Sequence, residues 1–153
     1  MSEKKNDDLR ESIFGKTGMQ EKFGIKLPPE SAIELQSQFV EYVPKKSLSV
    51  SFPVQEKHTG PLGILQGGIL TAFFDDTFGP LSYATLGKPM LTIDIHVHFI
   101  RSSKPGDVIT VKAEIVSRGR QMIFMKAEAF NQKNKLIATS TTSALILSEM
   151  EKV

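Results

Sequence analysis

The hydrophobic and polar positions of this chain follow two different periods. In residues 48–54, LSVSFPV, every second side chain is apolar, and this period of two predicts a strand with one buried face. The same signal returns after residue 90 and predicts four further strands, over residues 92–100, 110–116, 121–130 and 135–147. The short polar segments SRGR and NQKN between the last three strands suit antiparallel hairpins.

A long helix is predicted between the first strand and the others, over residues 67–86. Its apolar side chains cover nearly every direction around the axis, which is typical of a buried helix. Asp75 and Asp76 are its only charged residues. Pro80 is expected to kink the helix and Gly87 to end it.

The N-terminal part of the chain lacks these strong signals. A short amphipathic helix is expected over residues 9–24, and the turn LPPES at 27–31 is expected to lead into a second helix that continues to about residue 39. Residues 1–37 are therefore interpreted as an accessory helical segment, and residues 38–148 as the main domain. The accessory helices either shape the mouth of a pocket or cover an edge of the sheet.

The order of elements indicates the fold class. No GxGxxG sequence follows the first strand and no helix separates the later strands, which excludes a nucleotide-binding parallel sheet. One long apolar helix with several antiparallel strands predicts an α+β domain in which a curled sheet wraps around the helix.

Composition narrows the function classes. The chain has 153 residues, 40% of them hydrophobic, which fits one globular domain. It carries a net charge of +2 without a basic run, has no cysteine, and begins with a charged segment unlike a secretory signal. No segment is long and apolar enough to span a membrane. A cytoplasmic protein with no nucleic-acid or membrane partner is expected.

Three motifs follow one another at defined spacings. Residues Gln66, Gly67 and Gly68 open the long helix, Asp75 follows nine positions after Gln66, and the turn RSSKPGD occupies residues 101–107. Over residues 38–148 this order resembles the hotdog-fold acyl-CoA thioesterases of the phenylacetic-acid-degradation type, which have a His-Gly-Gly turn, an acidic residue nine positions after the His, and a similar later turn. The chain departs from that pattern in having Gln66 in place of the His, and Gly60 where an Asn or Gln is common.

The resemblance implies an acyl-CoA thioesterase that needs no cofactor and works as a homodimer or a dimer of dimers, with its cleft between subunits. It assigns Asp75 as the general base or nucleophile and the Gly67 N–H as the donor to the oxyanion. It gives Gln66 a polarising or positioning part, and Thr92 a part in orienting the water.

The adjacent carboxylates are expected to differ in role. A carboxylate in an apolar pocket has a raised pKa, which suits a base or nucleophile. Neighbouring helical residues point about 100° apart, so Asp75 and Asp76 cannot share one pocket as a protease-like dyad. The spacing in the family selects Asp75 as the working acid, and Asp76 is interpreted as structural and more solvated.

Coenzyme A carries phosphates, so cations are expected beside the cleft. Arg101, Lys104, Arg118 and Arg120 lie in or next to turns and are candidates for phosphate contact, together with the backbone at Gly68.

Rival interpretations remain open at this stage. The protein is alternatively a catalytically weak acyl-CoA or acyl-lipid binding module, or less readily a hotdog dehydratase that uses His58. One strand face carries three polar side chains, Asp94, His96 and His98. They either bind a metal or simply form the solvent-facing side of the strand, and the second interpretation is favoured. The helix aromatics Phe73, Phe74, Phe78 and Tyr83 either line an acyl pocket or belong to the core.

Overall fold

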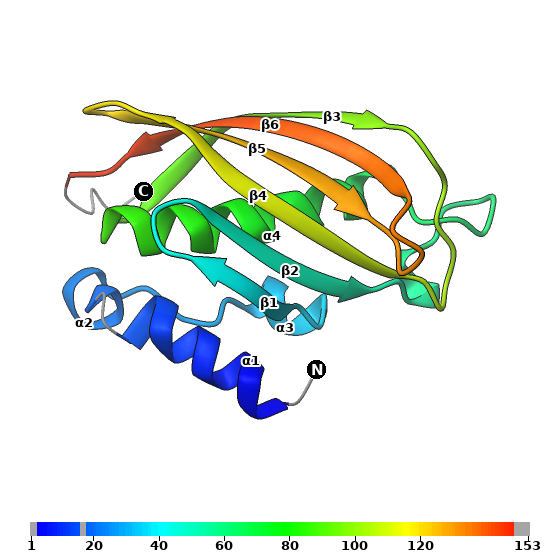
Figure 1. Ribbon diagram of the computed structural model, residues 1–153, viewed down its shortest axis with the longest axis horizontal. Helices are drawn as coiled ribbons and strands as arrows, with labels where there is room; N and C mark the ends of the chain where they lie inside the picture. The colour runs from blue at the N-terminus through cyan, green and yellow to red at the C-terminus, as the bar shows by residue number, and fades with distance from the viewer. Residues whose placement is uncertain (1–2, 16–17, 149–153) are drawn as a thin grey trace.

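The computed structural model describes residues 3–15 and 18–148 of the chain. It contains one six-stranded antiparallel sheet and one long helix that lies along the sheet's concave side (Figure 1). In sequence order the elements are α1 (Glu3–Arg10), the π-helical turn η1 (Glu11–Gly15), α2 (Met19–Phe23), α3 (Glu30–Glu34), β1 (Gln38–Val43), β2 (Ser47–Pro53), the short 3-10 helix η2 (Glu56–His58), α4 (Gly67–Leu86), β3 (Met90–Phe99), β4 (Val108–Arg118), β5 (Met122–Phe130) and β6 (Leu136–Ile146).

The sheet has the order β1-β2-β4-β5-β6-β3, and every neighbouring pair is antiparallel. Helix α4 connects β2 to β3, which lie toward opposite sides of the sheet, and β4–β6 fill the space between them. One edge of the sheet is β1 and the other is β3. The prediction of a curled sheet around one helix is therefore confirmed.

The core lies between α4 and the inner face of the sheet. The ring of Phe73 on α4 stacks on the ring of Phe52 on β2, with centroids 4.4 Å apart and planes 5° from parallel. Phe74 and Phe78 are also fully buried. These three helix aromatics belong to the core, because burying their large apolar surface is what fixes the helix against the sheet.

Helix α4 begins and ends where the sequence predicted. Gln66 caps its N-terminus through the side chain, and Gly87 ends it in the left-handed conformation at φ 60°, which glycine adopts without strain.

Two predictions for the N-terminal part were wrong. The helix expected over 9–24 begins at Glu3 and is divided into α1, η1 and α2, and its residues 16–17 lie outside the described part. The helix expected to reach residue 39 ends at Glu34, and residues 38–43 form strand β1. A register shift between Phe39 and Glu41 interrupts the period of two in β1, which explains why alternation did not reveal the strand. The division of the chain into two parts at residues 37 and 38 stays a prediction.

Helix α1 covers the β1 edge. The backbone N–H of Phe39 donates to the Asn6 side chain at 2.7 Å, so a polar group of this edge is satisfied from within the chain.

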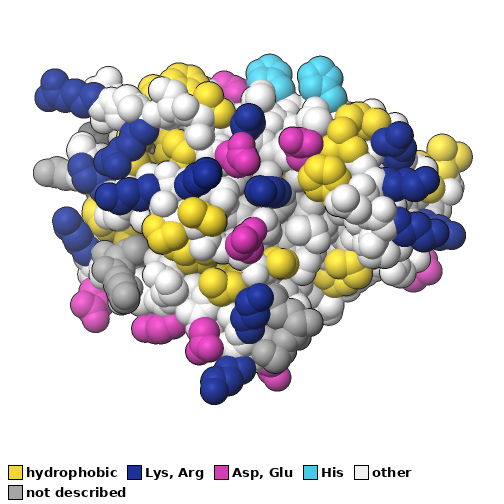
Figure 2. Space-filling model, viewed as in Figure 1, with side chains coloured by type: hydrophobic (Ala, Val, Ile, Leu, Met, Phe, Trp, Pro, Cys, Tyr) yellow, Lys and Arg dark blue, Asp and Glu magenta, His cyan; other side chains and the backbone are white. Residues whose placement is uncertain are grey.

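Within the described part of the chain, no helix is both long enough and apolar enough to cross a membrane. Lys and Arg side chains gather toward both ends of the face shown in Figure 2, with acidic side chains scattered between them.

The stacking of Phe73 on Phe52 predicts that truncating Phe73 strongly lowers the stability of the fold. Replacing Phe73 by Ala should lower the free energy of unfolding by about 3–5 kcal/mol, because it leaves a cavity between α4 and β2. Leu62→Ala is the matched control, since Leu62 is 84% exposed and its truncation should change stability by less than about 0.5 kcal/mol. Urea unfolding followed by circular dichroism measures both. Equal effects of the two substitutions would contradict this account of the core.

Candidate active site

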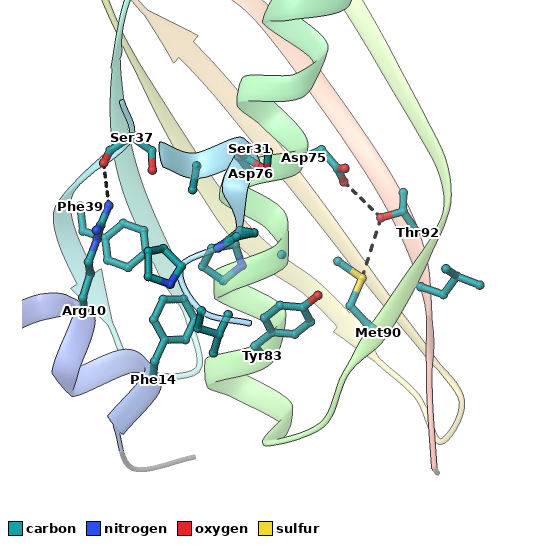
Figure 3. A pocket seen from close by; sticks show the side chains of 17 residues that line it. Arg10, Phe14, Ser31, Ser37, Phe39, Asp75, Asp76, Tyr83, Met90 and Thr92 are labelled. Atoms are coloured by element: carbon teal, nitrogen blue, oxygen red, sulfur yellow. Dashed lines mark hydrogen bonds between the residues drawn. The ribbon is translucent and has the colours of Figure 1, made fainter. Parts of the chain in front are cut away.

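Asp75 lies on α4 beside the first half of β3. The Thr92 hydroxyl donates a hydrogen bond to the Asp75 Oδ1 atom at 3.1 Å (Figure 3). Both residues line a cavity of about 400 Å³. The Asp75 side chain is exposed in the single chain, so the expectation of a carboxylate buried in an apolar pocket does not hold for this residue.

A β-bulge directs Thr92 toward the helix. Thr92 pairs with the buried Ala144 and Asp94 pairs with Ser143, so Ile93 is an extra residue in β3 and is 56% exposed. Strict alternation would have put Thr92 on the same face as Asp94. The bulge reverses this, because one inserted residue turns the strand to its other face. Strict alternation over the strand predicted at residues 92–100 would also have put Ile93 on the same face as Ile95 and Val97, and the bulge removes it from that face.

Asp76 is the more buried of the two carboxylates. Its Oδ1 atom accepts a hydrogen bond from the Ser31 hydroxyl of α3 at 3.0 Å, whereas its buried Oδ2 atom has no hydrogen-bond partner in the described chain. Burial raises the pKa of Asp76 to about 6, the Ser31 bond opposes this, and the neighbouring charge of Asp75 adds to it. The expectation that Asp76 is the more solvated residue was therefore wrong, because the N-terminal segment covers it.

The glycine turn forms the N-terminus of α4. The Gln66 Oε1 atom accepts from the Ile69 N–H at 3.2 Å, so the residue at the usual His position acts as a helix cap. Among the described residues, the N–H groups of Gly67 and Gly68 have no acceptor. A Cβ at Gly67 would come within 3.1 Å of the Phe99 ring, which explains the glycine there by close packing.

The free amides and Asp75 are separated within one chain. Gly67 precedes Asp75 by eight residues, which corresponds to about 12 Å along the helix axis at 1.5 Å per residue. The expectation that the glycine amides lie beside Asp75 is thus not met by a single chain.

The four predicted phosphate contacts do not lie together either. Arg101 borders a smaller cavity with Gly67, and its guanidinium donates to the Leu136 carbonyl at 2.7 Å. Lys104 is exposed in the same turn, where its backbone N–H donates to Asp107 at 3.0 Å. Arg118 and Arg120 lie at the other end of β4, about 30 Å away at 3.3 Å per residue. One chain therefore presents two separate basic ends.

Among the described residues, neither the candidate metal site on β3 nor His58 has the surroundings that its alternative function would need. The Asp94 carboxylate accepts from both the N–H and the hydroxyl of Ser143, and the His96 Nε2 atom lies 3.8 Å from Asp94. Nowhere in residues 3–15 and 18–148 do three or more His, Asp or Glu side chains come together as a metal site. His58 is buried, accepts from the Gln55 N–H through Nδ1, and does not line the cavity that contains Asp75.

The N-terminal segment forms one wall of the cavity, so it has both of the roles left open for it: α1 covers the β1 edge, and the segment shapes the pocket. This wall contains residues that sequence reasoning did not assign to the site: Arg10, Phe14, Leu27, Pro28, Pro29, Ser31, Ala32 and Ser37. Tyr83 of α4 also lines the cavity, and burial raises the pKa of its hydroxyl, with a further contribution from the Asp75 charge. No sequence pattern pointed to these N-terminal residues, because they come from several short elements that form one wall only when the chain is folded.

The raised pKa of Asp76 predicts that the free energy of unfolding depends on pH. Its carboxyl binds a proton more readily in the folded than in the unfolded chain, whose Asp pKa is 3.8, so wild type gains stability as the pH falls from about 6 to about 4. Asp76→Asn should therefore be more stable than wild type by roughly 1 kcal/mol at pH 7.5, after allowing for partial solvent screening, and the difference should vanish near pH 4.

Asp107→Asn is the control of opposite sign. Hydrogen bonds from the Gln132 side chain and the Lys104 backbone lower the pKa of Asp107, so its removal should destabilise the protein at neutral pH. Thermal unfolding between pH 4 and pH 8 measures both variants. A stability loss for Asp76→Asn at pH 7.5 would mean that the Asp76 charge is well compensated.

Comparison with known proteins places the chain in a family. The thioesterase superfamily matches residues 62–138, just over half of the chain. The mouse (Mus musculus) protein named acyl-coenzyme A thioesterase 13 is 29% identical over 116 residues, which cover 74% of this chain and 81% of that protein.

Two solved structures share the fold. The PaaI protein from the phenylacetic acid degradation operon of E. coli superposes with a TM-score of 0.78 at 18% identity, covering 92% of this chain and 97% of its own. A hypothetical thioesterase of Streptococcus pneumoniae, solved with coenzyme A, superposes with a TM-score of 0.73 at 22% identity, covering 78% of this chain and 94% of its own. The predicted hotdog fold and the predicted thioesterase class are thereby confirmed, and the chain belongs to the thioesterase superfamily.

Proposed function

We propose that this protein hydrolyses acyl-CoA thioesters and that Asp75 carries out the reaction. The observation that supports this most directly is the Asp75 carboxylate, which accepts from Thr92 at 3.1 Å beside a cavity of about 400 Å³. A cavity of this size and partly apolar lining is suited to an acyl group. The name of the mouse relative, an acyl-coenzyme A thioesterase, supports the same substrate class.

Two routes are open to Asp75. As a general base, it takes a proton from water while the oxygen of that water adds to the thioester carbonyl carbon. As a nucleophile, it attacks that carbon itself, expels the coenzyme A thiolate and forms a mixed anhydride, which water then hydrolyses. Both routes produce a carboxylic acid and a free thiol. In both, the carbonyl oxygen gains negative charge that a free backbone N–H stabilises.

The separation of Gly67 and Asp75 along α4 supports a dimeric enzyme. Two copies of α4 in antiparallel orientation would place the Gly67 amide of one copy near Asp75 of the other. Strand β3 offers the surface for such pairing, since it is a sheet edge with exposed apolar side chains at Leu91, Ile93 and Phe99. An uncovered apolar edge strand favours pairing with a second copy. A homodimer, or a dimer of dimers built from it, is therefore part of the proposal.

The same arrangement suits the basic residues. Antiparallel pairing would bring the end of one copy that carries Arg101 and Lys104 alongside the end of the other that carries Arg118 and Arg120. These cations are proposed to contact the phosphates of coenzyme A, with the Gly68 amide as a further donor. A cytoplasmic location stays a prediction.

Asp75→Asn should lower kcat/KM for thioester hydrolysis by at least ~100-fold, because the amide is neither a base nor a carboxylate nucleophile. Thr92→Val should lower it by roughly 10-fold, since a hydrogen bond to a charged group contributes about 1.5 kcal/mol. Thiol release measured with a chromogenic thiol reagent reports both values. Tight acyl-CoA binding by wild type without thiol release would favour the alternative of a catalytically weak binding protein.

The oxyanion role of Gly67 can be separated from its packing role. Gly67→Pro removes the N–H at the first position of the helix, where proline is well tolerated, and should lower kcat by roughly 100-fold. Gly67→Ala is the matched control, because it adds a Cβ against Phe99 but keeps the N–H, and it should lose far less activity. Equal losses in the two variants would assign the effect to packing.

A mixed dimer tests the shared site. Co-expression of Asp75→Asn and Gly67→Pro chains with different affinity tags, followed by purification on both tags, isolates dimers with one chain of each kind. Because one of their two sites combines an intact Asp75 with an intact Gly67, they should recover about half of the wild-type activity. Mixed dimers as inactive as their parents would show that each site is built from a single chain.

A further inference from the structure

The cavity beside Asp75 has chemically different sides. Asp75 and Thr92 lie at one side, on α4 and β3, while Arg10 of α1 and Phe39 of β1 lie on the opposite side of the view in Figure 3. Between them the wall is mostly apolar or aromatic and includes Tyr83. A thioester whose carbonyl lies at Asp75 would direct its acyl group into this space.

Arg10 is a partly buried cation with incomplete pairing. Its Nη2 group donates to the Ser37 carbonyl at 2.9 Å, and its guanidinium carbon lies 5.6 Å from the centre of the Phe39 ring. Its buried Nε group has no hydrogen-bond acceptor in the described chain. None of the described carboxylates forms an ion pair with it.

The nearby carboxylates do not compensate the positive charge of Arg10. Glu3 and Asp7 share an outer groove with Arg10, but neither comes within 4.0 Å of it. Asp75 accepts from Thr92, and Asp76 accepts from Ser31 through Oδ1 only. Asp76 also lines the cavity, but neither carboxylate lies within 4.0 Å of Arg10. The positive charge of Arg10 therefore lacks a carboxylate partner on the wall of the cavity that this residue lines, and a carboxylate is the acceptor that matches the charge and planar geometry of a guanidinium.

We propose that Arg10 binds a carboxylate at the far end of the acyl group, so that the preferred substrates are thioesters of dicarboxylic acids. This inference rests on the proposed function of Asp75. It makes Arg10 a specificity-determining residue in the N-terminal segment, outside the residues that the superfamily matches. An acyl carboxylate at this side also stays away from the negative charge of Asp75.

A matched pair of thioesters tests the inference. Adipoyl-CoA and hexanoyl-CoA have the same number of acyl carbons and differ in a carboxylate or a methyl group at the far end, and glutaryl-CoA and suberoyl-CoA extend the series in length. Wild type should hydrolyse its best dicarboxylic thioester with a kcat/KM at least ~10-fold above that of the methyl-ended thioester of equal length.

Variants assign the preference to Arg10. Arg10→Gln should abolish the preference, because it should lower kcat/KM for adipoyl-CoA at least ~10-fold more than kcat/KM for hexanoyl-CoA. Arg10→Glu should reverse it, so that 6-aminohexanoyl-CoA becomes a better substrate than adipoyl-CoA. Lys5→Gln is the matched control, because it removes one exposed positive charge from the same helix and should leave the preference intact.

The outcomes separate a specificity role from a structural one. A parallel loss on all thioesters in Arg10→Gln, or no preference in wild type, would overturn the inference and leave Arg10 as a clamp between α1 and Ser37. Thermal unfolding of each variant shows whether the N-terminal segment still packs.

A binding measurement keeps this inference distinct from the proposed function. Calorimetric titration of the Asp75→Asn variant with adipoyl-CoA and hexanoyl-CoA reports affinity without turnover. Tighter adipoyl-CoA binding that disappears with Arg10→Gln supports the inference even if wild type releases no thiol. Thiol release by wild type without any preference for a carboxylate overturns the inference and leaves the hydrolase proposal standing.

Discussion

The structure depends on the burial of α4 against the concave side of the sheet. The stacked rings of Phe52 and Phe73 and the buried rings of Phe74 and Phe78 fix the rotation of this helix. Once the rotation is fixed, the next residues along the helix have no freedom in where they point. Asp75 must face β3 and Asp76 must face the N-terminal segment, because neighbouring helical residues differ by about 100° in direction. The position of the carboxylates is thus a consequence of hydrophobic packing one turn away.

Packing gives the two neighbouring carboxylates different environments. Asp75 remains accessible and is held by Thr92, which suits a group that has to meet substrate and water. Asp76 is covered by α3, and its raised pKa reflects the cost of keeping a carboxylate under that cover. Its bond to Ser31 ties the N-terminal segment to the helix at the residue next to Asp75. Asp76 is thus a costly buried group beside the residue that we propose to carry out the reaction, and such a cost is tolerated where a site is selected for chemistry rather than for stability.

The N-terminal segment completes the cavity beside Asp75. The superfamily match begins at residue 62, so α1, η1, α2 and α3 all precede it. These elements nevertheless supply a wall of the cavity next to Asp75, including Arg10, which forms no ion pair with a described carboxylate. Variation in such a covering segment changes the shape and charge of a pocket without disturbing the sheet and helix that hold the reactive groups.

The sequence by itself determined α4 to the residue, the approximate positions of five strands, the fold class and the candidate Asp75, because each follows from local periodicity or from the spacing of a motif. It did not determine β1, the bulge at Ile93, the burial of Asp76 or the approach of Arg10 to the cavity. Each of these depends on contacts between residues far apart in the chain: pairing of β1 with β2 and α1, pairing of β3 with β6, and packing of α1 and α3 near α4. The bulge is the clearest case, since a period of two assigns Thr92 to the outer face and one extra residue opposite β6 turns it inward to Asp75. Local patterns record which face of an element is apolar, whereas only the assembled tertiary structure decides what that face meets.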